Sequence, residues 1–136
     1  MASSRTELSF RGPVETACLD RTHDLLAQLW QEQPDVAEMD QIMFSTAVLE
    51  VANNIVSHGG AGTVSIVLNG DARQLEASFC DDGAAVEVDL QNAVLPDDLA
   101  ESGRGLALVR MAVDEFSYSH SDGFSRWHLV RRRSPS

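Results

Sequence analysis

Apolar and polar positions follow two different periods along the chain, and these periods predict strands and helices. Alternation with a period of two is typical of half-buried strands, which we expect at residues 7–11, 63–68, 74–81, 116–120 and 125–131. Apolar positions spaced three and four apart are typical of amphipathic helices, which we expect at residues 14–33, 40–59 and 106–114. Turn-forming residues predict two hairpins, around Asn69-Gly70-Asp71 and around Ser121-Asp122-Gly123.

The order of these elements predicts an α+β fold. We expect a two-layer sandwich in which helices cover one face of a mixed, mainly antiparallel sheet, with the other face exposed or paired with another subunit. Residues 84–102 have no periodic pattern, which is typical of a disordered segment or of a functional lid. The length indicates a single domain, residues 1–136, with flexible tails at 1–5 and 132–136.

Charge narrows the classes of partner. The 136 residues carry a formal charge of −11, from 21 acidic and 10 basic residues, and every basic residue is Arg. An acidic chain neutralises phosphates poorly, so we expect no direct binding of nucleic acid and no docking on an anionic membrane. The three consecutive Arg residues at 131–133 are few and terminal, and we expect them to form a solvated tail.

The cytosol is the expected compartment. The sequence has neither a signal-peptide pattern nor an apolar run long enough to span a bilayer. Cys18 and Cys80 lack the close spacing of a metal site or a disulfide framework, so we expect two ordinary buried thiols.

The helix expected at residues 40–59 carries the first candidate site. Its apolar stripe consists of Phe44, Val48, Val51 and Ile55. Glu50, Asn54 and His58 follow one another at i, i+4 and i+8 and form a polar stripe beside it. Either this polar stripe faces solvent at the edge of the helix or it faces a ligand, because an unpartnered carboxylate is costly to bury for stability alone.

Parity along the strand at 74–81 selects a second candidate. Asp81 shares the core-facing side of the strand with the apolar residues at positions 75, 77 and 79, whereas Asp82 points to the other side. Gly83 follows, where the chain turns or lets a ligand approach closely. These residues form either an ordinary turn that ends the strand or a site in which Asp81 accepts a hydrogen bond from an amino group of a ligand.

The third candidate is Gly103-Arg104-Gly105, at the start of the helix expected at 106–114. The first N–H groups of a helix and its positive dipole end suit a phosphate, and glycines let the phosphate reach the backbone. Arg104 adds a charge-assisted contact. The alternative is a flexible helix start. A Walker-type loop is excluded, because it needs a longer glycine spacing and a Lys.

In this order, the three candidates resemble the GHKL ATPase superfamily, which includes histidine kinases, gyrase B and the Hsp90 chaperones. Residues 50–59, 103–109 and 114–116 resemble the bacterial anti-sigma serine-protein kinases of sporulation and stress response, and the resemblance extends over about residues 8–130. Ala84 and Ala85 stand where the family often has Gly or Pro, and without Lys any cationic lid contact must come from Arg104 or a partner.

The resemblance implies a Bergerat-type ATP-binding fold, the cofactors ATP and Mg²⁺, and a role for each matched residue. Glu50 matches the catalytic base, and Asn54 matches the residue that binds the magnesium ion bridging the phosphates. Asp81 matches the aspartate that recognises the adenine amino group, and Gly83 matches the glycine beside the base. The segment that binds the phosphates matches Gly103, Arg104, Gly105 and Leu106. For His58 we expect only a hydrogen bond to the backbone.

The resemblance also implies an activity, an ATP-dependent serine/threonine protein kinase that acts as an anti-sigma factor. Such a kinase phosphorylates a small anti-anti-sigma antagonist of the STAS type, and after that phosphorylation it holds a sigma factor or another effector. The family suggests a homodimer. The alternative is a non-catalytic, ATP-responsive binding module that sequesters the effector, although Glu50 and Asn54 favour the enzyme. A histidine kinase fragment is disfavoured, because no helix bearing a phosphoacceptor His precedes the domain.

Overall fold

The structure is a computed structural model that describes residues 5–58, 60–85 and 100–134, with only the backbone described at His58 and at residues 100–105. Helices and strands follow the predicted order closely. The elements are β1 (Thr6–Pro13), α1 (Ala17–Glu32), α2 (Glu38–His58), β2 (Thr63–Gly70), β3 (Gln74–Asp81), α3 (Ala100–Ala112), β4 (Glu115–Ser121) and β5 (Phe124–Arg132).

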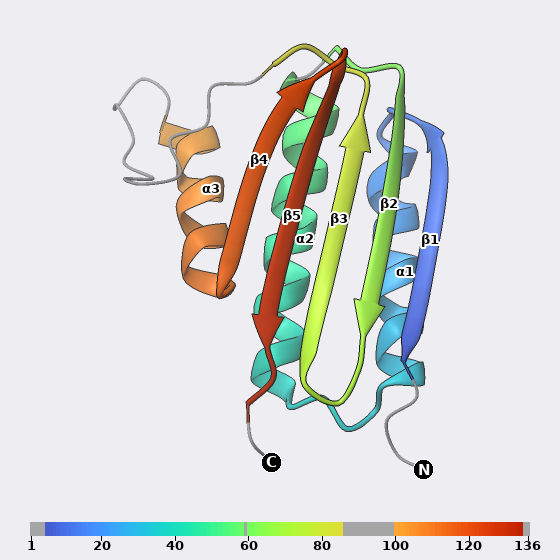
Figure 1. The fold of residues 1–136 in the computed structure, drawn as a ribbon, viewed down its shortest axis with the longest axis vertical. Coiled ribbons are helices and arrows are strands. Elements are labelled where there is room, and N and C mark those ends of the chain that lie inside the picture. The colour runs from blue at the N-terminus through green and yellow to red at the C-terminus, as the bar shows by residue number, and fades with distance from the viewer. Residues whose placement is uncertain (1–4, 59, 86–99, 135–136) are drawn as a thin grey trace.

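The strands form one five-stranded sheet in the order β1-β2-β3-β5-β4, and each of the four pairings between described strands is antiparallel. The helices α1 and α2 lie behind this sheet, and α3 lies beside α2 near β4 (Figure 1). The predicted α+β fold with helices on one face is confirmed. The described sheet is wholly antiparallel rather than mixed, because its strands are joined by hairpins or through helices that return the chain in the opposite direction.

The core lies between the sheet and α2. The apolar stripe predicted on this helix is fully buried, and alternate residues of β2, β3 and β5 meet it from the sheet. The largest of these buried side chains are Trp127, Phe44, Phe79, Leu29, Ile66 and Leu68. Although α2 has 21 residues, no helix in the described parts of the chain is long and apolar enough to cross a membrane.

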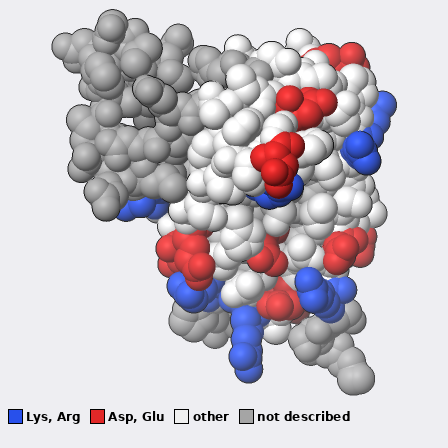
Figure 2. All heavy atoms as spheres, turned by 45° about the horizontal axis from the view of Figure 1, so that its top comes forward, with Lys and Arg blue, Asp and Glu red and all other residues white. Residues whose placement is uncertain are grey.

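The opposite face of the sheet is not covered by a described helix. Ser65, Val67, Ser78 and Cys80 on this face are small and uncharged, whereas Glu76 of β3 has the same parity and pairs with His128 of β5. Figure 2 shows that charged groups on this side are scattered in small groups, several of them near the end of the sheet where the two termini lie.

The first predicted hairpin turn is wrong by about two residues. Asn69 and Gly70 belong to β2, and the turn itself is built by Asp71, whose Oδ1 accepts hydrogen bonds from the N–H groups of Arg73 at 2.7 Å and Gln74 at 3.0 Å. Gly70 packs closely against α1 instead, because a Cβ atom there would lie 3.1 Å from the Leu29 side chain, and that side chain would have to shift. The second hairpin turns as predicted, with positive φ angles of 55° at Asp122 and 82° at Gly123.

The three Arg residues at 131–133 do not form a solvated tail, so this prediction is wrong. Arg131 shares the helix-facing parity of Trp127 and Leu129 on β5, and its side chain is paired with Asp40. Arg132 is the last residue of β5, and the N–H of Arg133 donates to the carbonyl of Arg73 at 2.8 Å. A strand places alternate residues toward the core, so an Arg at this position needs a buried anionic partner.

The two cysteines differ in their surroundings. Cys18 is buried in α1, and burial raises the pKa of its thiol. Cys80 is half-buried on the open face of the sheet. Both are free thiols, and only Cys18 fits the expectation of a buried one.

Candidate functional site

Two of the three candidate segments end at the same end of the sheet. Helix α2 ends at His58, and β2 begins five residues later at Thr63. The next residue of β2, Val64, is paired with Asp81, which is the last residue of β3. The carboxyl ends of α2 and β3 therefore lie together (Figure 1).

The third segment reaches this end through α3. Arg131 contacts both Asp40, in the first turn of α2, and the carbonyl of Ala112, the last residue of α3. The start of α2 is therefore beside the end of α3, and the two helices pack against each other in opposite directions. The amino-terminal part of α3, which contains Gly103, consequently lies toward the end of the sheet that carries Asp81.

Glu50 and Asn54 are one turn apart on α2. The Asn54 side chain is 6% exposed, and its Nδ2 donates a hydrogen bond to the backbone carbonyl of Glu50 at 2.8 Å. That bond turns the amide oxygen Oδ1 away from the helix backbone, and no donor within the described residues bonds to it. The Glu50 side chain is half-buried and has no hydrogen bond or ion pair to a described residue. A carboxylate and a hard oxygen are thus available side by side.

The neighbouring positions support the predicted helix register. Asn53 is exposed, so of the two consecutive asparagines only Asn54 faces the interior. The polar stripe does not simply face solvent. The side chain of His58 and the whole of Gly59 lie outside the described residues.

Asp81 is buried, with 4% of its surface exposed, as its parity predicts. Its Oδ1 accepts a hydrogen bond from the N–H of Gly83 at 2.9 Å, and its Oδ2 accepts one from Nε1 of Trp127 at 3.1 Å. A carboxylate has about four lone-pair sites, so two acceptor positions remain. Gly83 is itself buried and holds the Asp81 carboxylate in place through its backbone.

Asp82 faces the other way and closes the end of the sheet. Its Oδ1 accepts hydrogen bonds from the N–H groups of Gly62 at 2.7 Å and Thr63 at 2.9 Å. These backbone hydrogen bonds, first from Thr63 and then from Gly62, lower the pKa of this exposed carboxyl. The Asp81 side chain thus points to the interior, whereas the Asp82 side chain binds the backbone of the loop that follows α2.

The predicted helix start at Gly103-Arg104-Gly105 is wrong. Helix α3 begins at Ala100, within the predicted lid, so these three residues are its fourth to sixth residues. The N–H groups that lack an intrahelical partner end with the third helical residue, so neither Gly103 nor Gly105 offers a free helix N–H, and the free groups lie before Gly103. Ala100 and Glu101 favour helix without contributing an apolar period, and the sequence pattern therefore missed them.

Of the other residues predicted to bind phosphates at the start of α3, the structure describes the side chain of Leu106 but not that of Arg104. Leu106 is partly buried and packs against the core, so it anchors α3. The side chains of residues 100–105, including Arg104, and all of residues 86–99 lie outside the described residues. Within the predicted lid, Ala84 and Ala85 are exposed.

Two residues beside Asp81 were not identified from the sequence. Ser125, which is 1% exposed, is the β5 residue paired with Asp81, and its Oγ lies 2.9 Å from the hydroxyl of Tyr118 and 3.0 Å from Nδ1 of His120. Trp127 supplies the indole donor described above. Their parity on β5 pointed to the core, but the sequence does not reveal the register between β3 and β5.

The oxygen atoms available at this site suit a magnesium ion that is coordinated mainly by the phosphates of a bound molecule and by water. No group of three or more His, Cys, Asp or Glu side chains able to hold a metal occurs among the described residues. Asn54 offers one hard oxygen without a hydrogen-bond donor in the described part of the chain. Mg²⁺ binds through few protein ligands and keeps several waters or phosphate oxygens, so a single amide oxygen fits this ion better than a site built only of protein ligands.

Comparison with protein families identifies the domain. The family described as "Histidine kinase-like ATPase domain" matches residues 15–126. This chain belongs to that family. The matched region of the histidine kinase-like ATPase domain contains all three candidate segments, on α2, β3 and α3. A comparison with curated proteins finds no match.

Solved structures share the fold at low identity. The RsbU and RsbW domains of Rv1364c from Mycobacterium tuberculosis align with a TM-score of 0.66 and 20% identity, covering 96% of this chain and 34% of that one. This chain therefore spans about a third of that protein's length. The catalytic domain of histidine kinase ThkA aligns over 100% of both chains, with a TM-score of 0.55 and 9% identity. Acinetobacter baumannii histidine kinase AdeS aligns with a TM-score of 0.53 and 15% identity, covering 94% of this chain and 68% of that one.

Proposed function

We propose that this histidine kinase-like ATPase domain is an ATP-dependent serine/threonine protein kinase that also acts as an anti-sigma factor. Its substrate is a small anti-anti-sigma antagonist of the STAS type, which it phosphorylates on a Ser or Thr hydroxyl. The observation that carries this proposal is the pairing of Glu50 and Asn54. A half-buried carboxylate without a described partner lies one helical turn from an amide oxygen without a donor.

Glu50 serves as the general base. Its carboxylate accepts the proton of the Ser or Thr hydroxyl as that oxygen attacks the γ-phosphorus and ADP leaves. Because no described residue bonds to the carboxylate, it is free to accept this proton. Asn54 would hold Mg²⁺ through Oδ1, and the ion supplies positive charge to the phosphates when bound.

Asp81 selects the base of the nucleotide. Its carboxylate accepts a hydrogen bond from an amino group, as adenine has at position 6, whereas an oxo group there would meet a second acceptor. Gly83 and Trp127 keep the carboxylate in one orientation before the ligand arrives. The first N–H groups of α3, just before Gly103, donate to a phosphate oxygen.

A protein partner is supported by exposed apolar side chains. Four of the five large exposed apolar residues in the described chain lie on the two helices that carry the candidate site, Met39 and Ile42 on α2 and Leu108 and Met111 on α3. Methionine adapts its shape and is common on surfaces that bind proteins. The STAS-type antagonist and the sigma factor are the partners that we assign to this domain, which we place in the cytoplasm.

The experiment that tests the kinase is incubation of the protein with γ-labelled ATP, Mg²⁺ and candidate STAS-type proteins, followed by mapping of the labelled residue. Label on a Ser or Thr of one candidate supports the proposal. Label on a His of the partner or of this chain would assign a histidine kinase instead. Binding of ATP and of a partner without any transfer would replace the kinase with an ATP-responsive binding module.

A further inference from the structure

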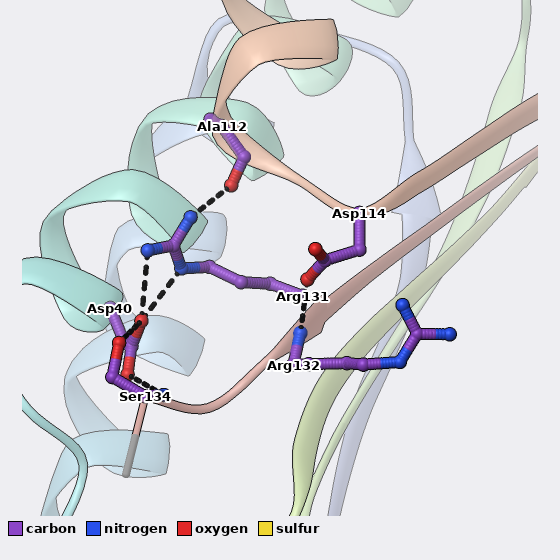
Figure 3. Close-up of polar contacts among 6 residues, drawn as sticks. All are labelled: Asp40, Ala112, Asp114, Arg131, Arg132 and Ser134. Carbon is purple, nitrogen blue, oxygen red and sulfur yellow. Dashed lines mark hydrogen bonds and ion pairs between the residues drawn. The ribbon is translucent and has the colours of Figure 1, made fainter.

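A buried ion pair lies at the end of α2 and α3 that is remote from the candidate site. Nε of Arg131 donates to Oδ1 of Asp40 at 2.9 Å, and Nη2 lies at the same distance from that oxygen. The side chain of Asp40 is 0% exposed, and Ser134 donates to it from its N–H at 2.8 Å and from its Oγ at 3.1 Å. Figure 3 shows these groups around one carboxylate.

The same guanidinium also holds α3. Nη1 of Arg131 donates to the carbonyl of Ala112, the last residue of this helix, at 2.7 Å (Figure 3). The last four carbonyls of a helix have no intrahelical donor, and a cation there is also favoured by the helix dipole. Arg131 therefore belongs to β5, caps the carboxyl end of α3, and is itself paired with Asp40 of α2.

The other described contacts of α3 are apolar, and they lie mainly against α2. Val109 and Ala112 are buried, and Leu106 is partly buried. Leu108 and Met111, on the same helix, are 46% and 75% exposed. Among the described side chains of α3, the apolar packing is thus on one side of the helix, and the Arg131 hydrogen bond adds a directed contact at its end.

We propose that the Asp40–Arg131 pair positions α3 and, through it, the phosphate-binding end of the candidate nucleotide site. This inference rests on the proposed function. Gly103 precedes Ala112 by nine residues, which is about 14 Å along the helix axis, so a rigid helix transmits its position from one end to the other. Asp81 lies on β3 and is held by Gly83 and Trp127, and this part of the site does not depend on α3.

The inference predicts that the pair affects phosphates and not the base. In the double variant Asp40→Leu with Arg131→Met, apolar side chains replace the pair, a change that often leaves a fold intact. The bond to the Ala112 carbonyl is lost. We expect affinity for ATP to fall about tenfold, within the usual range of coupling between distant sites, while affinity for adenosine stays within about twofold.

The matched control is Arg132→Met. It removes the same charge from the next residue, whose side chain makes an exposed pair with Glu115, and it should leave both affinities unchanged. Calorimetric titration of ATP and of adenosine into wild type and both variants gives the four comparisons. Circular dichroism establishes that each protein is folded.

Two results would overturn the inference. One is an unchanged ATP affinity in the folded double variant, and the other is an equal loss of ATP and adenosine affinity, which would indicate general loosening. Wild type that binds neither ligand would overturn the proposed function as well. If the double variant does not fold, Arg131→Lys replaces it, because an ammonium keeps the charge but not the planar fork that reaches two partners. Arg131→Lys is then expected to weaken ATP binding and to leave adenosine binding unchanged. An ATP affinity equal to that of wild type would contradict the inference.

Discussion

Trp127 donates a hydrogen bond from Nε1 to Oδ2 of Asp81 across 3.1 Å inside the core. The indole also packs against Tyr118, with ring centroids 4.4 Å apart, so its ring is fixed from the side. The carboxylate that we assign to adenine recognition is therefore oriented by the protein before a nucleotide binds. Such orientation lowers the entropic cost of binding.

The substitution Trp127→Phe should destabilise the fold. It removes a hydrogen bond to a charged group, which contributes about 1.5–3 kcal/mol, and leaves part of the indole volume empty. The free energy of unfolding, measured with urea, should fall by at least about 1.5 kcal/mol. Trp30→Phe is the control, since Trp30 is only partly buried and its indole has no hydrogen bond within the described residues. Equal losses for the two variants would contradict a special role for the Trp127 indole.

Asp81→Asn should weaken ATP binding. The amide loses the charge and turns an NH₂ group toward one of the donors around it, so we expect a loss of about 1.5–3 kcal/mol in binding free energy. Calorimetric titration with ATP in the absence of magnesium measures this loss. Asp82→Asn makes the same chemical change at an exposed residue that bonds the Gly62 and Thr63 amides, and it should bind ATP as wild type does. Unchanged affinity in a folded Asp81→Asn protein would reduce Asp81 to a structural residue.

Asn54→Ala should abolish most of the increase in ATP affinity that magnesium produces. The reason is the loss of Oδ1, the amide oxygen that faces away from the Glu50 carbonyl. Asn53→Ala removes an identical side chain from the exposed face of the same helix and should retain the magnesium effect. Titrations with and without Mg²⁺ compare the two variants. A magnesium effect lost in Asn53→Ala but retained in Asn54→Ala would reverse our assignment.

The stability of the fold should depend on pH through Asp40. Burial alone would raise the pKa of this carboxyl, but hydrogen bonds from the Ser134 N–H, from Arg131 and from the Ser134 hydroxyl, together with the Arg131 charge, lower it below its ordinary value of 3.8. A lowered pKa means that the contribution to stability is present above about pH 4 and is lost as the pH falls through the pKa of the folded state.

Urea unfolding between pH 6 and pH 3 tests this dependence. We expect wild type to lose stability as the pH falls below 4, and Asp40→Asn to lose less over the same interval because the group that titrates is gone. Asp24→Asn changes an exposed carboxylate on α1 and should follow the wild-type curve. Identical curves for Asp40→Asn and wild type would show that other carboxyls control the acid transition.

Much of the fold and part of the site could be predicted from the sequence, for identifiable physical reasons. The strand from Gln74 to Asp81 was predicted to the residue, because strict alternation both defines a strand and assigns Asp81 to its buried side. The register of α2 was also correct, since Asn54 shares a long helix with a clear apolar stripe. Local periodicity carries this information.

The rest depended on contacts between distant segments. Arg131 and Asp40 are 91 residues apart, and nothing in the run of three Arg residues distinguishes a buried pair from a solvated tail. Trp127 and Asp81 meet only because β3 and β5 pair in one register, which local patterns do not determine. The start of α3 at Ala100 was missed because helix propensity without an apolar period is a weak signal.

The central claim is that Glu50 is the base of a protein kinase, and single-turnover phosphorylation of the STAS-type antagonist by Glu50→Gln tests it most directly. Glutamine keeps the shape of the side chain but cannot take a proton from the substrate hydroxyl. We predict that the variant binds ATP and the antagonist nearly as well as wild type, yet transfers phosphate about 10²- to 10⁴-fold more slowly. Transfer at the wild-type rate by the folded Glu50→Gln protein would contradict the claim.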